Sequence, residues 1–253
     1  MRTGYGKMRK LLGILMLSLA MVLPSACAAQ AASALSAVPE KSVPVRTKSR
    51  KEASMKLGSS VLYSYGQLYQ GSQTIRNSGC SYCAAASLIG LAKGKKVLPV
   101  SLLPLNQKKY SMSFKSMGAV CEKYGVGYVY VRRYGSRSQT LSLMKNCLLQ
   151  HRPVICFVKG KWSTGSYHLV LLAGITDKGR VLVADSARDR SWSGSMQRFK
   201  LVRWNDLTRY ICALKSTGRK EMYASTAKMP KSWGCLASPG VQYGFLTTAK
   251  AVY

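Results

Sequence analysis

Two apolar runs on either side of a short polar turn constrain the fold of this chain more than any other feature. They lie in YHLVLLAGITDKGRVLVADS, residues 167–186, and the turn spans residues 176–179. An Asp and a Gly at such positions favour a tight turn, and runs rich in Val, Ile and Leu favour buried strands. The pattern predicts a β-hairpin in which His168, at the start of one strand, lies level with Asp185, at the end of the other.

The segments around the hairpin predict an α+β fold, with N-terminal helices packed on an antiparallel sheet. Composition and apolar spacing predict helices over residues 80–94, 113–125 and 136–152. Ser78 and Gly94 are suited to capping the first of these helices. Strand-like runs lie at residues 127–133, 154–160, 198–202 and 210–216. Since helices and strands do not alternate as βαβ units, we expect an antiparallel sheet.

The N-terminus has the order of a secretory signal peptide. The basic segment MRTGYGKMRK precedes the apolar run LLGILMLSLAMVL, and the small residues of PSACAAQAASA follow. We therefore expect residues 1–31 to be removed after Ala29-Gln30-Ala31, and the protein to be secreted, extracellular or associated with the cell wall. A lipid anchor on Cys27 ranks second, because Pro24 stands where a lipoprotein signal has Leu.

The rest of the chain divides into three parts by composition. Residues 32–57 are small, polar and basic, which predicts a flexible linker. One globular domain is expected over residues 58–216, and the pattern assigns no structure to a C-terminal extension, residues 217–253. The chain has eight cysteines, of which Cys27 lies in the predicted leader. Export permits disulfides, and the odd number left requires at least one free thiol or an intermolecular bond.

Basic residues greatly outnumber acidic ones. The 253-residue chain has 39 Lys and Arg against 8 Asp and Glu, a formal net charge of +31. Such an excess predicts binding to polyanions. Because the leader predicts export, we expect an anionic cell-wall polymer or membrane surface as a partner, and no nucleic acid. The alternative is a solvated basic surface without a dedicated partner.

Cys80 and Cys83 lie three residues apart in SGCSYCAAASLIGLAKG, residues 78–94. A zinc site needs about four ligands, and the chain has two histidines and no second CxxC pair, so no metal is expected. A thioredoxin-like redox pair would follow a strand, whereas a polar loop precedes this one. The third interpretation is a reactive thiol. Cys80 begins a helix whose dipole and N–H groups favour the thiolate, while Cys83 turns into the core.

A thiolate nucleophile needs a base and a group that orients the base. His168, at the mouth of the hairpin, is the candidate base, because His151 ends a helix, where a cation has a favourable structural role. Acidic residues are few, and Asp185 and Asp189 are the ones near the hairpin's open end. Asp185 is the candidate orienting acid because it lies at the strand end.

Four motifs carry a resemblance to a known family: SGCSYCAAASLI, LLQHRPVICFV, GSYHLVLLAGITDKGRVLVADSA and WNDL. Their order and spacing resemble those of papain-fold cysteine peptidases similar to the bacteriocin-processing, double-glycine leader peptidases, in a secreted bacterial form. The resemblance covers residues 60–215. It implies a papain-like fold, no cofactor, and a peptide or protein substrate.

Residue by residue, the resemblance implies that Cys80 is the nucleophile, His168 the general base and Asp185 the acid that orients the histidine. It also implies a Gln a few residues before the Cys as an oxyanion donor. Gln73 is the nearer in spacing, and Gln67 is the alternative.

Two positions depart from the family pattern. Ser81-Tyr82-Cys83 replaces Gly-Pro-Thr after the nucleophile, and Ser186 replaces the Pro after the Asp. Tyr82 is expected to place a bulky ring near the substrate cleft. The leading hypothesis is a secreted cysteine peptidase that cleaves an amide bond through a Cys-His-Asp triad. The alternatives are a papain-clan acyltransferase or amidase, similar to the transglutaminases, and an inactive basic wall-binding protein on a peptidase scaffold.

Overall fold

The computed structural model describes residues 37–43, 51–133, 136–158, 168–186, 198–212, 221–224 and 245–253, all within the unit Ala37–Tyr253. The predicted signal peptide, Cys27 and Asp189 lie outside the described residues. No helix in those ranges has the length and hydropathy needed to cross a membrane.

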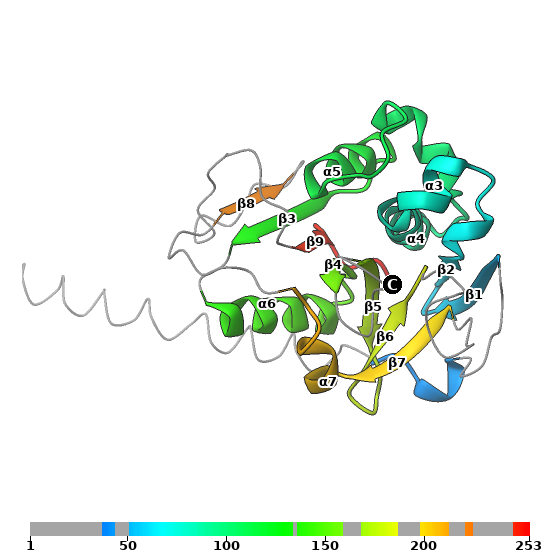
Figure 1. Cartoon of the computed structure of the whole chain (residues 1–253). Helices are drawn as coiled ribbons and strands as arrows, with labels where there is room; N and C mark the ends of the chain where they lie inside the picture. Colours follow the sequence, from blue (N-terminus) through cyan, green and yellow to red (C-terminus); the bar gives the residue numbers. More distant parts are fainter. Residues whose placement is uncertain are drawn as a thin grey trace, which may run out of the picture. The chain divides into compact units, whose positions relative to one another are not determined.

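A seven-stranded sheet runs through the described residues, in the order β7-β6-β5-β4-β9-β3-β8 (Figure 1). Every neighbouring pair in it is antiparallel. Its strands are β3 (Tyr128–Arg133), β4 (Val154–Val158), β5 (His168–Ile175), β6 (Arg180–Ala184), β7 (Phe199–Arg203), β8 (Glu221–Ala224) and β9 (Phe245–Thr248). Together with the helices, this sheet confirms the predicted α+β class.

The other described elements are a two-stranded hairpin, α-helices and short 3-10 helices. The hairpin consists of β1 (Glu52–Leu57) and β2 (Ser60–Tyr65). The α-helices are α3 (Gln73–Ser78), α4 (Cys80–Lys93), α5 (Phe114–Lys123), α6 (Arg137–Leu149) and α7 (Trp204–Thr208). The 3-10 helices are η2 (Glu40–Ser42), η3 (Gln67–Tyr69), η4 (Pro99–Leu102) and η5 (Pro104–Asn106).

Strand β5 is buried on both faces of the sheet. Leu169 and Leu171 pack into a core shared with α4, α5 and the β1–β2 hairpin. Val170 and Leu172 pack into a second core with α6 and α7. Every residue of β5 is buried, which explains why its sequence is a continuous apolar run and not an alternating one. The strand that begins with His168 is therefore held from two sides.

The predicted flexible linker, residues 32–57, is wrong over its last residues, because Glu52–Leu57 forms β1. Ala53, Met55 and Leu57 are buried, and the residues between them are exposed. This period of two is that of a strand with one face on the core. The polar and basic residues on the other face hid the pattern. The remaining division of the chain into domains stays a prediction.

Part of the predicted C-terminal extension, residues 217–253, lies inside the sheet. Strand β9 pairs with β4 on one side and β3 on the other, and all of its residues are buried. The phenol of Tyr253 donates to the carbonyl of Ala173 at 2.9 Å. A Cβ at Gly174 would lie 2.1 Å from the same phenol oxygen, so the end of the chain packs tightly on β5. A strand of this length carries too little pattern to be predicted.

The segment 37–43 also belongs to the predicted linker, and it is bound to the tip of the β5–β6 hairpin. The N–H of Val38 donates to the carbonyl of Ile175 at 3.0 Å, and the N–H of Asp177 donates to the carbonyl of Val38 at 3.0 Å. The N–H of Glu40 donates to the Asp177 carboxylate at 3.1 Å. The segment thus adds a short parallel bridge to the hairpin turn.

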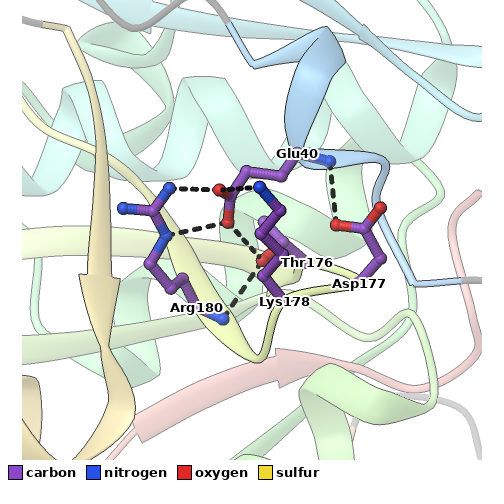
Figure 2. Close-up of polar contacts among 5 residues, drawn as sticks. All are labelled: Glu40, Thr176, Asp177, Lys178 and Arg180. Carbon is purple, nitrogen blue, oxygen red and sulfur yellow. Dashed lines mark hydrogen bonds and ion pairs between the residues drawn. The ribbon is translucent and has the colours of Figure 1, made fainter.

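Figure 2 shows how the Glu40 carboxylate closes this contact. It accepts hydrogen bonds from Arg180 Nε at 2.8 Å and Thr176 Oγ1 at 3.1 Å, and Arg180 Nη2 completes a bidentate pair. Lys178 Nζ lies 3.7 Å away. Glu40 is 6% exposed, so its charge is removed from water and depends on these partners.

We expect Glu40→Gln to destabilise the domain at neutral pH and to make it less sensitive to acid. The hydrogen bond from Arg180 outweighs burial and lowers the pKa of Glu40 from 4.5 to about 2. A carboxyl with a lowered pKa stabilises the fold above its unfolded pKa, and that stabilisation is lost as the pH falls from about 4.5 towards about 2. Thermal unfolding over this range should therefore show a steeper loss in the wild type than in the variant.

The matched control is Glu122→Gln, which changes an exposed acid on α5. It should follow the wild type across the pH series. Equal unfolding midpoints for the wild type and Glu40→Gln at neutral pH would show that the contact does not stabilise the domain.

Candidate active site

Cys80 is the first residue of α4, and Gly79 alone separates this helix from α3. A Cβ at Gly79 would lie 2.4–2.5 Å from atoms of Ile75, so a glycine is needed where the two helices meet. Ser78, the expected cap, is instead the last residue of α3, and no side chain caps α4. The predicted closing residue, Gly94, has φ +62° as expected. The uncapped N-terminus favours negative charge at Cys80.

Cys80 is more exposed than the residues that follow it in the first turn of α4. Cys80 is partly exposed, whereas Cys83 is 1% exposed and lies in the core, as predicted. Tyr82 is fully buried, so its expected place near the cleft is wrong. Its phenol donates to the carbonyl of Lys109 at 2.5 Å and accepts from Asn106 Nδ2 at 2.7 Å. These bonds hold the ring in the interior, against the segment that contains η5.

His168 and Asp185 are in direct contact, with His168 Nε2 2.7 Å from Asp185 Oδ1. The prediction that the two residues lie level across the hairpin is wrong. Leu171 pairs with Ala184, and the register shifts over Leu172–Gly174. The continuing register places Asp185 diagonal to His168, a separation that long side chains can bridge. The hairpin turn is centred one residue later than the spacing suggested, because Ile175 pairs with Val181. The register shift in β5 then brings Asp185 one residue closer to His168.

Lys200 is a further member of the site that the sequence reasoning missed. It lies on β7 opposite Val183 of β6, and its Nζ contacts Asp185 Oδ2. Asp185 is 1% exposed and so bridges the histidine and the lysine inside the protein. Burial would raise the pKa of Asp185, but the charges and hydrogen bonds of Lys200 and His168 lower it well below its usual range. A lone lysine in the strand-like run that follows the hairpin was the available signal.

The Cys80 thiol lies close enough to His168 for each group to shift the pKa of the other. Because Asp185 engages Nε2, Nδ1 is the ring nitrogen left for the thiol. Burial alone would raise the pKa of Cys80, but the hydrogen bond and charge of His168 lower it, with help from backbone groups of Leu169 and Ser81. Burial would lower the pKa of His168, but Asp185 and Cys80 raise it. Both shifts favour a thiolate and imidazolium pair.

The two candidate oxyanion donors occupy different environments. Gln73 begins α3 and is exposed. Gln67, in η3, is 4% exposed, and its Nε2 donates to the carbonyl of Arg76 at 3.1 Å. The N–H of Gln67 donates at 3.2 Å to the carbonyl of Ser186, the residue after Asp185. This position beside the histidine–aspartate pair favours Gln67, the alternative of the two.

His151 has a structural position away from this group. It follows α6 with φ +54°, and its ring packs edge-on against Tyr253 with centroids 4.6 Å apart. Burial lowers the pKa of His151, which favours the neutral ring over a cation at a helix end.

The described residues hold six cysteines, and all are free thiols: Cys80, Cys83, Cys121, Cys147, Cys156 and Cys212. Burial raises the pKa of Cys121 to about 12, and it also raises that of Cys156. Such thiols are poor nucleophiles. Within the described part of the chain, no three His, Cys, Asp or Glu side chains gather where they could hold a metal.

Comparison with known families agrees with this geometry. The model of the Peptidase_C39 like family matches residues 64–212, more than half of the chain, and this range contains Cys80, His168 and Asp185. No curated protein matches the chain. Helices packed on an antiparallel sheet are the architecture of a papain-like fold, as predicted. The chain therefore belongs to the Peptidase_C39 like family of papain-fold cysteine peptidases.

Proposed function

We propose that the protein is a cysteine peptidase that hydrolyses an amide bond of a peptide or protein substrate. The observation that carries this proposal is a relay of three side chains. The partly exposed Cys80 thiol lies beside His168, which lowers its pKa, and His168 is hydrogen-bonded to the buried carboxylate of Asp185. A nucleophile, a base and an orienting acid in this order are what amide hydrolysis by a thiol requires.

The reaction begins with the Cys80 thiolate, which attacks the substrate carbonyl carbon and forms a C–S bond. His168, as imidazolium, gives its proton to the leaving amine when the C–N bond breaks. A water molecule then attacks the acyl-enzyme while His168 takes one of its protons, and the Cys80 thiolate leaves. Asp185 keeps the ring oriented through Nε2 and stabilises its positive charge in the resting state.

The negative oxygen that forms during attack needs hydrogen-bond donors. The backbone N–H at the start of α4 is one candidate, and the side-chain amide of Gln67 is the other. One N–H of this amide is used by the carbonyl of Arg76, which fixes the side chain, and an amide has a second N–H to donate.

A thiol-directed electrophile should label Cys80 in the folded protein and leave Cys83 unmodified. Cys80→Ala should abolish hydrolysis of a mixed library of fluorogenic peptides, because the nucleophile is lost. Cys83→Ala should keep the activity and lose about 1 kcal/mol of stability, near the centre of the range for point mutations. Peptide mapping by mass spectrometry identifies the labelled thiol, and labelling of Cys83 without Cys80 contradicts the assignment.

Substitutions of Asp185 separate its charge from its role in orientation. Asp185→Asn still orients the ring but supplies no charge, so we expect about a tenfold loss in kcat/KM, roughly 1.4 kcal/mol in the barrier. Asp185→Ala loses both, and activity should fall about 100-fold. Asp189→Ala, the matched acid four residues along, should have little effect. An inactive Asp189→Ala beside an active Asp185→Ala would require a different triad.

We also propose that the protein is exported and binds an anionic wall polymer or membrane surface through its basic charge. The net charge of +31 and the N-terminal leader pattern support this proposal. Binding to isolated cell walls should weaken as salt increases, because exposed charges are screened over roughly 10 Å at 0.1 M ionic strength. Co-sedimentation at low and high salt measures this. Retention that does not respond to salt would favour a lipid anchor at Cys27.

A further inference from the structure

The peptidase proposal leaves Cys83 without a role, although it lies one helical turn from the proposed nucleophile. Cys80 and Cys83 span the first turn of α4, where the N–H of Cys83 donates to the carbonyl of Gly79 at 3.0 Å. Side chains three residues apart on a helix lie on one face, with Cβ atoms about 5–6 Å apart. A disulfide needs about 3.5–4.5 Å between Cβ atoms, so a contraction of roughly 1–2 Å in this terminal turn brings the pair within bonding range.

The two thiols differ in the way that a reactive thiol and its resolving partner differ. Cys80 is partly exposed and Cys83 is 1% exposed, so an oxidant from solution meets Cys80 first. Burial and the charge of Cys80 raise the pKa of Cys83, which keeps it protonated in the resting state. Redox-sensing cysteines are commonly an accessible thiolate beside such a second thiol.

The surroundings of Cys83 also support its reaction with an oxidised Cys80. The positive charge of Arg198 and the nearby Ser186 hydroxyl oppose part of the effect of burial on the pKa of Cys83, which remains raised. Arg198 is 2% exposed and Ser186 is 4% exposed, so both act within the protein interior. These groups stabilise the Cys83 thiolate at the moment when it attacks.

We propose that Cys80 and Cys83 form a reversible disulfide that switches the site off under oxidising conditions and protects the nucleophile. With a peroxide as oxidant, the Cys80 thiolate attacks one peroxide oxygen and the O–O bond breaks. Cys80 becomes a sulfenic acid, and the leaving hydroxide takes a proton from the His168 imidazolium to form water. Cys83 then loses its proton, its sulfur attacks the Cys80 sulfur, and the S–O bond breaks to release a second water. Two thiols and one peroxide thus give one disulfide and two waters.

Reduction restores the site by thiol–disulfide exchange. A small dithiol attacks the disulfide, forms its own disulfide, and returns two electrons and two protons to the pair. The loss of activity that accompanies oxidation depends on the proposed function, because it assumes that Cys80 is the nucleophile. The formation of the bond does not depend on it and can be measured without a substrate.

The test uses the full chain, reduced and then treated with hydrogen peroxide. Cleavage after Arg76 and Lys93 releases residues 77–93, a peptide that contains Cys80 and Cys83 and no other cysteine. We expect this peptide to become lighter by two hydrogen atoms and to resist alkylation, and both changes to reverse with dithiothreitol. Peptidase activity should be lost and recovered in parallel. Cys121→Ala, which removes a buried thiol on α5, should behave as the wild type.

The variant that isolates the resolving thiol is Cys83→Ala. It should be active when reduced, and prolonged peroxide should add oxygen atoms to Cys80 and inactivate it in a way that dithiothreitol does not reverse. A wild-type peptide that gains oxygen without losing two hydrogen atoms would overturn the proposal, as would equal reversibility in the wild type and Cys83→Ala. If the disulfide forms in a protein that cleaves no peptide when reduced, the peptidase proposal fails and the disulfide pair stands.

Discussion

Burial of strand β5 on both faces is the constraint on which the site depends. One face packs against α4 through Leu169 and Leu171, and the other packs against α6 and α7 through Val170 and Leu172. The strand therefore cannot shift towards either side without opening a cavity, a costly change in a close-packed interior. Because His168 begins this strand and Cys80 begins the helix packed on it, the distance between the proposed base and the thiol is set by core packing. The Glu40 contact holds the hairpin at the opposite end.

The sequence predicted those parts of the fold whose signals are local. The β5–β6 hairpin, α4 to α6, and the strands β3 and β4 each have a periodic or turn pattern of their own, and the structure has them. The contact between His168 and Asp185 was also predictable, since a turn at residues 176–179 brings the two strand ends together. The placement of Cys80 at a helix start followed from Ser-Gly before an alanine-rich run.

The features that were missed depend on segments far apart in the chain. Nothing near Glu40 in sequence indicates that it will form an ion pair with Arg180. The four residues of β9 are too few to predict that this strand lies between β4 and β3. Tyr82 looked like a cleft residue because its partner Asn106 is supplied by a later 3-10 helix. Lys200 could not be predicted for the same reason. Its contact with Asp185 depends on the pairing of β7 with β6.

In the proposed mechanism, Lys200 would also affect how readily His168 gives up its proton. A carboxylate buried beside His168 with no other partner would stabilise the imidazolium strongly, and an acid that holds its proton too tightly transfers it poorly. Here Asp185 contacts His168 through Oδ1 and Lys200 through Oδ2, so the two cations share one carboxylate. With the thiolate, the cluster then consists of two negative and two positive charges. This balance lets Asp185 stay ionised at 1% exposure, as a buried carboxylate without compensating cations would not.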